Sequence, residues 1–288
     1  MVVITPEDAV KLSPVFKGKA GRLLFRLALK LTGIDHVNEL HDYVWKQGTP
    51  PGPDFAKGIL DYAQIDFSIG NPERLESLPE GAFIVIANHV YGHIDGISLI
   101  DIFGHKRPKV KAMVNEFLTW IKGLEPNFIS VNPTTTKRET TSTSIAGVKS
   151  ALMQVRSGEP LILFPSGAVA DLKPREGWTV SEREWQDAAV RLIRKAGVPV
   201  VPVRFADKNS AFYYLLGLIH YKIRFVRLFH EVFNKKGTHP MVIIGPKISV
   251  EEQKAIPDNE FKQFLRDSVY NLPLPDNFKL RSELWKQQ

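Results

Sequence analysis

Short apolar runs recur along the chain between residues 64 and 245, and polar segments that contain glycine and proline separate them. The first run, QIDFSIG (64–70), has apolar side chains at every second position, an alternation that predicts a strand with one buried face. The later runs are continuous and rich in β-branched residues, which suits buried strands better than helices. They are AFIVIAN (82–88), VKAMV (110–114), NFISV (127–131), PLILF (160–164), VPVVPVRF (198–205) and PMVIIG (240–245).

Two longer segments between these runs have helical patterns. ETTSTSIAGVKSALMQVRSG (139–158) closes on a glycine, and SEREWQDAAVRLIRKAGV (181–198) has Ser181 as a candidate N-cap and Gly197 as a stop signal. Strands that alternate with helices indicate an α/β fold, with a mixed, largely parallel central sheet flanked by helices. Ligands of such sheets bind where strands end at their carboxyl ends, so the loops after the apolar runs are candidate sites.

The beginning of the chain has a different pattern. Residues 7–47 are predicted to be helical, and GRLLFRLALKLTGI (21–34) forms a basic amphipathic helix within them. Its two faces carry Arg22, Arg26 and Lys30 on one side and Leu23, Leu24, Leu27 and Leu31 on the other. Such a helix either packs its leucines on the domain or lies in a membrane interface.

Prolines and glycines in QGTPPGPDF (47–55) break this helical pattern. We therefore expect an N-terminal helical segment over residues 1–58, a candidate for membrane association, and one main domain over residues 59–288. A second apolar stretch, AFYYLLGLIHYKI (211–223), is too short to span a bilayer. It is either a core helix or a helix that dips into the lipid headgroup region, since aromatic and basic residues flank each other there.

Composition narrows the class of protein. With 288 residues, 43% apolar and 24% charged, the chain has the composition of a globular protein, and disorder is not indicated. The net charge of +7 favours an anionic partner such as an anionic membrane surface or a phosphorylated substrate. Nucleic acid is not expected, because neither an interleaved aromatic pattern nor a helix-turn-helix or zinc-finger spacing is present.

The chain contains no cysteine, which excludes disulfides, thiolate nucleophiles and cysteine metal ligands. No apolar run approaches the roughly 20 residues of a membrane-spanning helix, and the first residues do not resemble a secretory signal. These features predict a cytoplasmic protein.

The segment NHVYGHIDG (88–96) places His89, His93 and Asp95 at the end of a predicted strand. One interpretation is that these polar groups only satisfy a buried loop. A second is a metal site, because His89 and His93 have the spacing of two ligands on a helix and Asp95 supplies a third. A third is a general base, in which a turn through Gly92 folds the Asp95 carboxylate onto the His89 imidazole and sets its tautomer. Spacing alone does not separate the last two.

A second segment after a strand distinguishes between them. LILFPSGAVAD (161–171) resembles the FPEG block of the glycerophospholipid acyltransferase superfamily, and NHVYGHIDG resembles the block in that family with a histidine and a downstream aspartate. The chain has five residues between His89 and Asp95. This spacing resembles the subgroup of bacterial acyltransferases often labelled hemolysin-like, some of which acylate lyso-ornithine lipid. The resemblance covers roughly residues 60 to 250.

The resemblance implies an α/β enzyme that moves a fatty acyl group from acyl-CoA or acyl carrier protein to the hydroxyl of a lysolipid, at the inner face of the cell membrane. It implies His89 as the general base and Asp95 as its orienting partner. No cofactor or metal is implied, and no acyl-enzyme is expected because no nucleophile elbow is present. Candidate substrate-binding residues are Asn88, Gly92, Phe164, Pro165, Ser166, Gly167, Lys137, Arg138, Lys173 and Arg175.

Two departures from the family pattern bear on the acceptor. Ser166 stands where the common block has glutamate, and AVAD follows where the family often has an arginine that holds a phosphate. The four basic residues nearest the loops are therefore candidates for binding an anionic headgroup, with solvated loop charges as the other interpretation. A metal-dependent hydrolase that uses His89, His93 and Asp95 and a non-catalytic lipid-binding protein are the alternative functions.

Overall fold

The computed structural model describes residues 17–21, 23, 34–115, 118–119, 121–131, 142–219 and 221–285. Several residues discussed above lie outside this part of the chain, so the predictions that depend on them stay predictions. They are Arg22, Leu24, Arg26, Leu27, Lys30 and Leu31 of the amphipathic helix and the two candidate headgroup ligands Lys137 and Arg138.

An eight-stranded sheet forms the centre of the molecule, with the strand order β10-β1-β9-β8-β2-β5-β3-β4. The strands are β1 (Ser68–Gly70), β2 (Ile84–Ala87), β3 (Lys111–Asn115), β4 (Phe128–Val131), β5 (Leu161–Leu163), β8 (Val200–Phe205), β9 (Met241–Ile244) and β10 (Phe278–Leu280). Each of the seven apolar runs contains or overlaps one of them. The β8–β9 and β1–β10 pairs are antiparallel and the other pairs are parallel, which confirms the predicted mixed, largely parallel α/β sheet.

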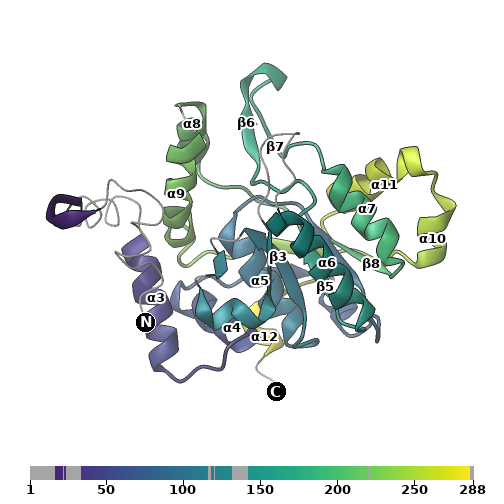
Figure 1. The fold of residues 1–288 in the computed structure, drawn as a ribbon, viewed down its shortest axis with the longest axis horizontal. Helices are drawn as coiled ribbons and strands as arrows, with labels where there is room; N and C mark the ends of the chain where they lie inside the picture. The colour runs from purple at the N-terminus through teal and green to yellow at the C-terminus, as the bar shows by residue number, and fades with distance from the viewer. Residues whose placement is uncertain are drawn as a thin grey trace.

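Helices cover both faces of the sheet, because successive strand residues point to opposite sides. In β2, Val85 and Ala87 belong to the core beneath α3 (Ile34–Lys46), α4 (Pro53–Tyr62) and α5 (His93–Gly104). Ile84 and Ile86 belong to the second core, beneath α6 (Ser142–Arg156), α7 (Asp187–Ala196) and α11 (Asp258–Tyr270). Figure 1 shows the two groups of helices on either side of the strands. β2 therefore lies in the middle of the fold, paired with β5 and β8.

Shorter elements complete the described chain. They are α10 (Val250–Ala255), α12 (Arg281–Leu284) and the 3₁₀ turns η2 (Pro72–Leu75), η4 (Lys122–Asn127) and η5 (Pro174–Glu176). The predicted boundary between residues 58 and 59 falls inside α4, and α3 and α4 share the core of the sheet. None of the helices in the described residues is both long and apolar enough to cross a bilayer.

Four elements form a separate group at one end of the sheet. β6 (Asp171–Lys173) and β7 (Thr179–Ser181) make a two-stranded hairpin, and α8 (Ala211–Ile219) and α9 (Tyr221–Phe233) follow β8. A small core joins them, formed by Tyr213, Tyr214 and Leu228 of the helices and by Val169, Leu172 and Val180 of the hairpin segment. We call these four elements the outer unit; Figure 1 shows α8 and the hairpin projecting beyond the sheet on the same side.

The predicted start of the helix at Ser181 is wrong. Ser181 is the last residue of β7, and α7 begins at Asp187 after an N-cap at Gln186. The intervening residues 182–186 have no regular structure because Glu182 and Trp185 turn inward and are buried. The predicted stop is confirmed, since Gly197 caps α7 with a φ of 62°, a conformation that glycine adopts without strain.

Candidate active site

The β2 exit segment, residues 88–95, leaves the central strand at its carboxyl end. His89 follows β2 after one residue, and α5 begins at His93. Gly92 precedes the helix with a φ of 88°, which lets the chain reverse direction between the strand and the helix. Its position has no room for a side chain, because an added Cβ would lie 2.6 Å from Leu228 of α9.

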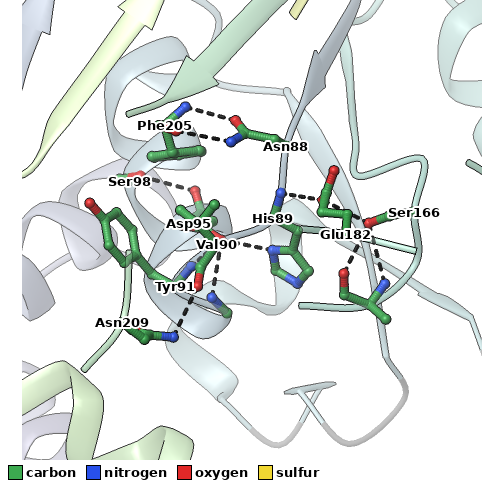
Figure 2. Close-up of polar contacts among 12 residues, drawn as sticks. Asn88, His89, Val90, Tyr91, Asp95, Ser98, Ser166, Glu182, Phe205 and Asn209 are labelled. Carbon is green, nitrogen blue, oxygen red and sulfur yellow. Dashed lines mark hydrogen bonds and ion pairs between the residues drawn. The ribbon is translucent and has the colours of Figure 1, made fainter. Parts of the chain in front are cut away.

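This turn brings Asp95 back against His89, as predicted. Asp95 Oδ2 lies 2.8 Å from His89 Nδ1, and the same oxygen accepts the backbone N–H of Tyr91 at 2.9 Å and that of Gly92 at 3.0 Å. The Asp95 side chain is fully buried in the first turn of α5, where the helix dipole favours a negative charge. Figure 2 shows these contacts around the carboxylate.

The pairing sets how the imidazole is presented. A carboxylate at Nδ1 accepts the N–H there and leaves Nε2 as an acceptor for another proton. Nε2 faces away from Asp95 in Figure 2. The His89 side chain is 19% exposed, and Phe164 stacks on its ring at a centroid distance of 4.3 Å. The ring is thus oriented from two sides while one edge stays accessible.

His93 has a different environment. Its ring stacks on Phe229 of α9 at 4.7 Å, and burial, with a smaller contribution from the neighbouring His89, lowers the pKa of His93 from 6.5 to about 4. It is therefore neutral at pH 7. Among the residues that the structure describes, no three His, Asp or Glu side chains gather in a way that would hold a metal ion. The geometry therefore gives no support to the metal-dependent alternative.

Two amides hold the β2 exit segment in place. The Asn88 side chain donates to the carbonyl oxygen of Phe205 at 2.9 Å and accepts the N–H of the same residue at 2.7 Å, so both ends of its amide are used on β8. Asn209 donates to the carbonyl oxygen of Val90 at 2.9 Å. Substrate binding by Asn88 stays a prediction; both ends of its amide bond the backbone of Phe205, next to His89 (Figure 2).

The β5 exit loop, residues 164–170, lies beside the histidine. Phe164 contacts the imidazole, whereas Pro165 and Ser166 are buried. The Ser166 hydroxyl lies 3.0 Å from the carbonyl oxygen of Ala168 and 2.8 Å from Glu182 Oε1. Gly167 has a φ of 64°, a backbone conformation that favours glycine, and it lies against the end of the Gln186 side chain. Substrate binding by these residues stays a prediction.

Glu182 is the site residue that sequence reasoning missed. Its buried carboxylate accepts the backbone N–H of His89 at 2.5 Å, the Ser166 hydroxyl, the Trp185 indole N–H at 3.4 Å and the Tyr270 hydroxyl. Burial, followed by the negative charge of Glu182, raises the pKa of the Tyr270 hydroxyl, which therefore stays protonated as a donor. The indication in the sequence is Ser166 itself: the related block has a glutamate there, whereas the carboxylate beside Ser166 in this chain belongs to Glu182, in the segment that follows β7.

The carbonyl oxygen of His89 is held as well. It accepts the backbone N–H of Ala170, in the β5 exit loop, at 2.8 Å. Glu182 therefore bonds the N–H of the histidine, Ala170 of the β5 exit loop bonds its C=O, and Asp95 holds its ring. The backbone and the side chain of His89 are thus fixed by separate sets of contacts.

The candidate headgroup ligands Lys173 and Arg175 belong to the hairpin of the outer unit. Lys173 in β6 lies 3.3 Å from Glu176 in an ion pair, and Arg175 in η5 is exposed. Neither is bonded to the residues around His89 in the contacts described above. Their role in headgroup binding stays a prediction.

Comparison with known proteins agrees with this site. Residues 68–206 match the model of the acyltransferase family, a range that contains His89, Asp95, the β5 exit loop and Glu182. A protein of Bacteroides thetaiotaomicron named lyso-glycine lipid O-acyltransferase is 26% identical over 252 residues, which cover 84% of this chain and 88% of that protein. A protein of Phocaeicola vulgatus with the same name is 27% identical over 275 residues, covering 92% and 94%. The chain therefore contains an acyltransferase domain over residues 68–206 and is an acyltransferase enzyme, as the two sequence blocks predict.

Proposed function

We propose that this enzyme transfers a fatty acyl group from a thioester donor, acyl-CoA or acyl carrier protein, to the hydroxyl of a lysolipid. The observation that carries the proposal is the contact of His89 Nδ1 with the buried Asp95 carboxylate, which leaves Nε2 at an accessible edge of the ring. The names of both similar proteins support an O-acyl transfer to a lysolipid. A lyso-glycine lipid is the first acceptor to test.

In the proposed reaction, His89 Nε2 removes the proton of the acceptor hydroxyl while its oxygen attacks the thioester carbonyl carbon. The tetrahedral intermediate then collapses, the C–S bond breaks, and the leaving thiolate takes the proton from the imidazolium. The products are an ester and a free thiol. Asp95 stabilises the imidazolium between the two proton transfers, and a base of this kind contributes about 10²–10⁴-fold to the rate. Backbone N–H groups near the loops are the proposed donors to the oxyanion.

We further propose that residues 59–288 act as the acyltransferase domain and that the enzyme works at the inner face of the membrane, where a lysolipid acceptor resides. The net charge of +7 supports attraction to anionic lipid. The basic amphipathic pattern that includes Arg22, Arg26 and Lys30 is a candidate contributor. Binding to anionic vesicles that does not weaken with salt would contradict this electrostatic contribution.

The test is a direct assay of the purified protein. Lyso-glycine lipid, lyso-ornithine lipid and lysophosphatidate are each supplied with acyl-CoA or acyl carrier protein, and the ester is detected by mass spectrometry. Wild type is expected to form ester with at least one pair, in the presence of chelator, and His89→Ala is expected to lower kcat by about 10⁴-fold without loss of fold, checked by circular dichroism. Wild-type activity in His89→Ala would refute the mechanism. Lipid binding without turnover on any pair would favour the non-catalytic alternative.

A further inference from the structure

The proposed function requires contact with a lipid surface but does not say which face of the enzyme makes it. Large apolar side chains stay exposed on one side of α8. They recur three or four residues apart, which places them on one helix face, and they are between 43% and 72% exposed: Phe212, Leu215, Leu218 and Ile219. Trp178, between η5 and β7 in the hairpin beside α8, is 64% exposed.

The opposite side of α8 already has its partners. Tyr213 and Tyr214 pack into the small core of the outer unit against Leu172 and Val180 of the hairpin. The exposed side chains are therefore an additional apolar surface, which we call the α8 face: Trp178, Phe212, Leu215, Leu218 and Ile219. Exposed apolar groups gathered on one helix face mark a protein or membrane interface.

Charge around the α8 face favours a membrane with anionic lipid. The stretch from residue 208 to residue 236, which holds both helices, contains six basic residues and one acidic residue, Glu231. Arg224 and Lys235 are buried in ion pairs with Asp171 and Glu231, whereas Lys208 and Lys236 are exposed and Arg227 is partly exposed. Arg227 lies over the ring of Phe212 with its guanidinium carbon 5.3 Å from the centroid, which puts a cation directly beside the apolar surface. Aromatic and aliphatic groups next to basic groups are the composition of helices that lie in a membrane interface.

The outer unit is bonded directly to the site. The buried Arg224 of α9 donates to the carbonyl oxygen of Ala170 at 3.0 Å, and the N–H of Ala170 donates to the carbonyl oxygen of His89. On the other side, Leu228 of α9 packs against Gly92, whose N–H is bonded to Asp95. The outer unit, which carries the α8 face, is thus connected through α9 to the segment that carries the candidate base. Figure 1 shows α8 and the hairpin side by side at that end of the molecule.

We propose that the α8 face is the surface through which this enzyme docks on an anionic bilayer, so that the acceptor enters the site from the outer unit. The proposal rests on the proposed lipid acceptor and adds the location of the contact. A second copy of the chain is the other occupant that such a surface can have, and the experiment below separates the two.

The test measures flotation of the full chain with vesicles of phosphatidylcholine, with or without about one third phosphatidylglycerol. Wild type is expected to bind the anionic vesicles. The double variant Leu215→Glu/Ile219→Glu is expected to bind them at least about tenfold more weakly. Leu274→Glu is the matched control, because Leu274 is 57% exposed on the loop before β10, outside the outer unit. Equal binding by wild type and the double variant, or an equal loss in Leu274→Glu, would overturn the proposal.

Two further measurements keep the outcomes distinct. The double variant is expected to acylate a dissolved short-chain acceptor at the wild-type rate and to lose rate only with vesicle-embedded acceptor. Absence of turnover in wild type with any acceptor contradicts the proposed function, while the flotation result still decides whether the α8 face binds lipid. Light scattering gives the oligomeric state: a wild-type dimer that the double variant dissociates would assign the α8 face to a second copy and overturn the membrane proposal.

Discussion

The β2 exit segment and the β5 exit loop lie side by side, but they are built in different ways. In the first, His89, the Tyr91 and Gly92 N–H groups and Asp95 all come from seven consecutive residues. In the second, the carboxylate that supports the loop comes from Glu182, sixteen residues after Ser166, and one of its donors is Tyr270, eighty-eight residues later. The chemistry of the site is thus encoded locally, whereas the position of its histidine depends on distant parts of the chain.

This difference gives the two carboxylates different expected effects. Asp95 contacts the imidazole and therefore acts on the protonation and orientation of the ring. Glu182 contacts the backbone of His89 and the hydroxyl of Ser166, and it therefore determines the position of the imidazole ring. Removing the first is expected to reduce the chemical step directly, and removing the second is expected to misplace a group that is otherwise intact.

Among the variants that test this comparison of the two loops, the largest effect is expected for Asp95→Asn. The amide keeps an oxygen that can accept the N–H groups of Tyr91 and Gly92, but it neither fixes the tautomer of His89 nor stabilises an imidazolium. We expect kcat to fall by about 10³-fold, with KM for the acyl donor little changed. Steady-state kinetics with saturating acceptor measure both constants, and thermal unfolding checks the fold. A kcat within about threefold of wild type would show that the pairing does not contribute.

The second prediction concerns the pH dependence of stability from His93. Its pKa is about 4 in the fold and 6.5 as the ordinary value, so the unfolded chain binds more protons between these values. The buried neutral ring contributes fully to the free energy of unfolding above pH 6.5. This free energy decreases as the pH falls toward 4, by up to about 3 kcal/mol. Urea unfolding of wild type and His93→Asn at pH 7 and pH 4.5 tests this. Wild type is expected to lose more free energy of unfolding than the variant; equal losses would contradict the buried neutral state.

The third prediction tests the support of the backbone. Glu182→Gln replaces two acceptor oxygens by one acceptor and one donor, so it cannot satisfy the donors from His89, Ser166 and Tyr270 together. We expect kcat to fall by about 10- to 100-fold through displacement of the histidine, with a smaller change in KM. Glu184→Gln is the control, because Glu184 is two residues away and exposed in an ion pair with Lys262.

A second variant separates positioning from general destabilisation. Ser166→Glu combined with Glu182→Gln puts a carboxylate where the FPEG block has one and is expected to recover part of the lost kcat. Recovery of thermal stability without recovery of kcat would show that Glu182 contributes to folding only, and equal activity of Glu182→Gln and wild type would exclude the positioning role.

The smallest effect is expected for Ser166→Ala. The single hydroxyl hydrogen has two acceptors within reach, Glu182 and the carbonyl oxygen of Ala168, and Glu182 keeps three other donors. The loss of the hydroxyl is therefore expected to cost about 1 kcal/mol of unfolding free energy and to lower kcat by about fivefold or less. Chemical denaturation and acyl-transfer rates measure the two quantities. A loss of kcat as large as that of Asp95→Asn would give Ser166 a direct role in substrate binding, as the sequence suggested.

The sheet was well predicted from the sequence, because most of its strands coincide with a short apolar run of a few residues. The seven apolar runs each contain or overlap a strand, while β10 and the β6–β7 hairpin were not predicted, since their three-residue strands are only partly buried. The pairing of His89 with Asp95 was also predictable, because a glycine turn followed by a helix start brings two residues six positions apart into contact. The predicted N-cap at Ser181 was wrong because the burial of Glu182 and Trp185 outweighs the local helical preference of that stretch.

By itself, the sequence determined the strands, the turn through Gly92 and the two chemical groups that meet across it, since these depend on backbone conformations and contacts within a few residues. Only the tertiary structure decided which of the two histidines stays accessible, which carboxylate supports it from behind, and which face of α8 is left exposed. Those outcomes depend on which groups the packing of the whole chain removes from water. The cost of burying a charge without partners then selects the one arrangement in which Glu182 meets its donors.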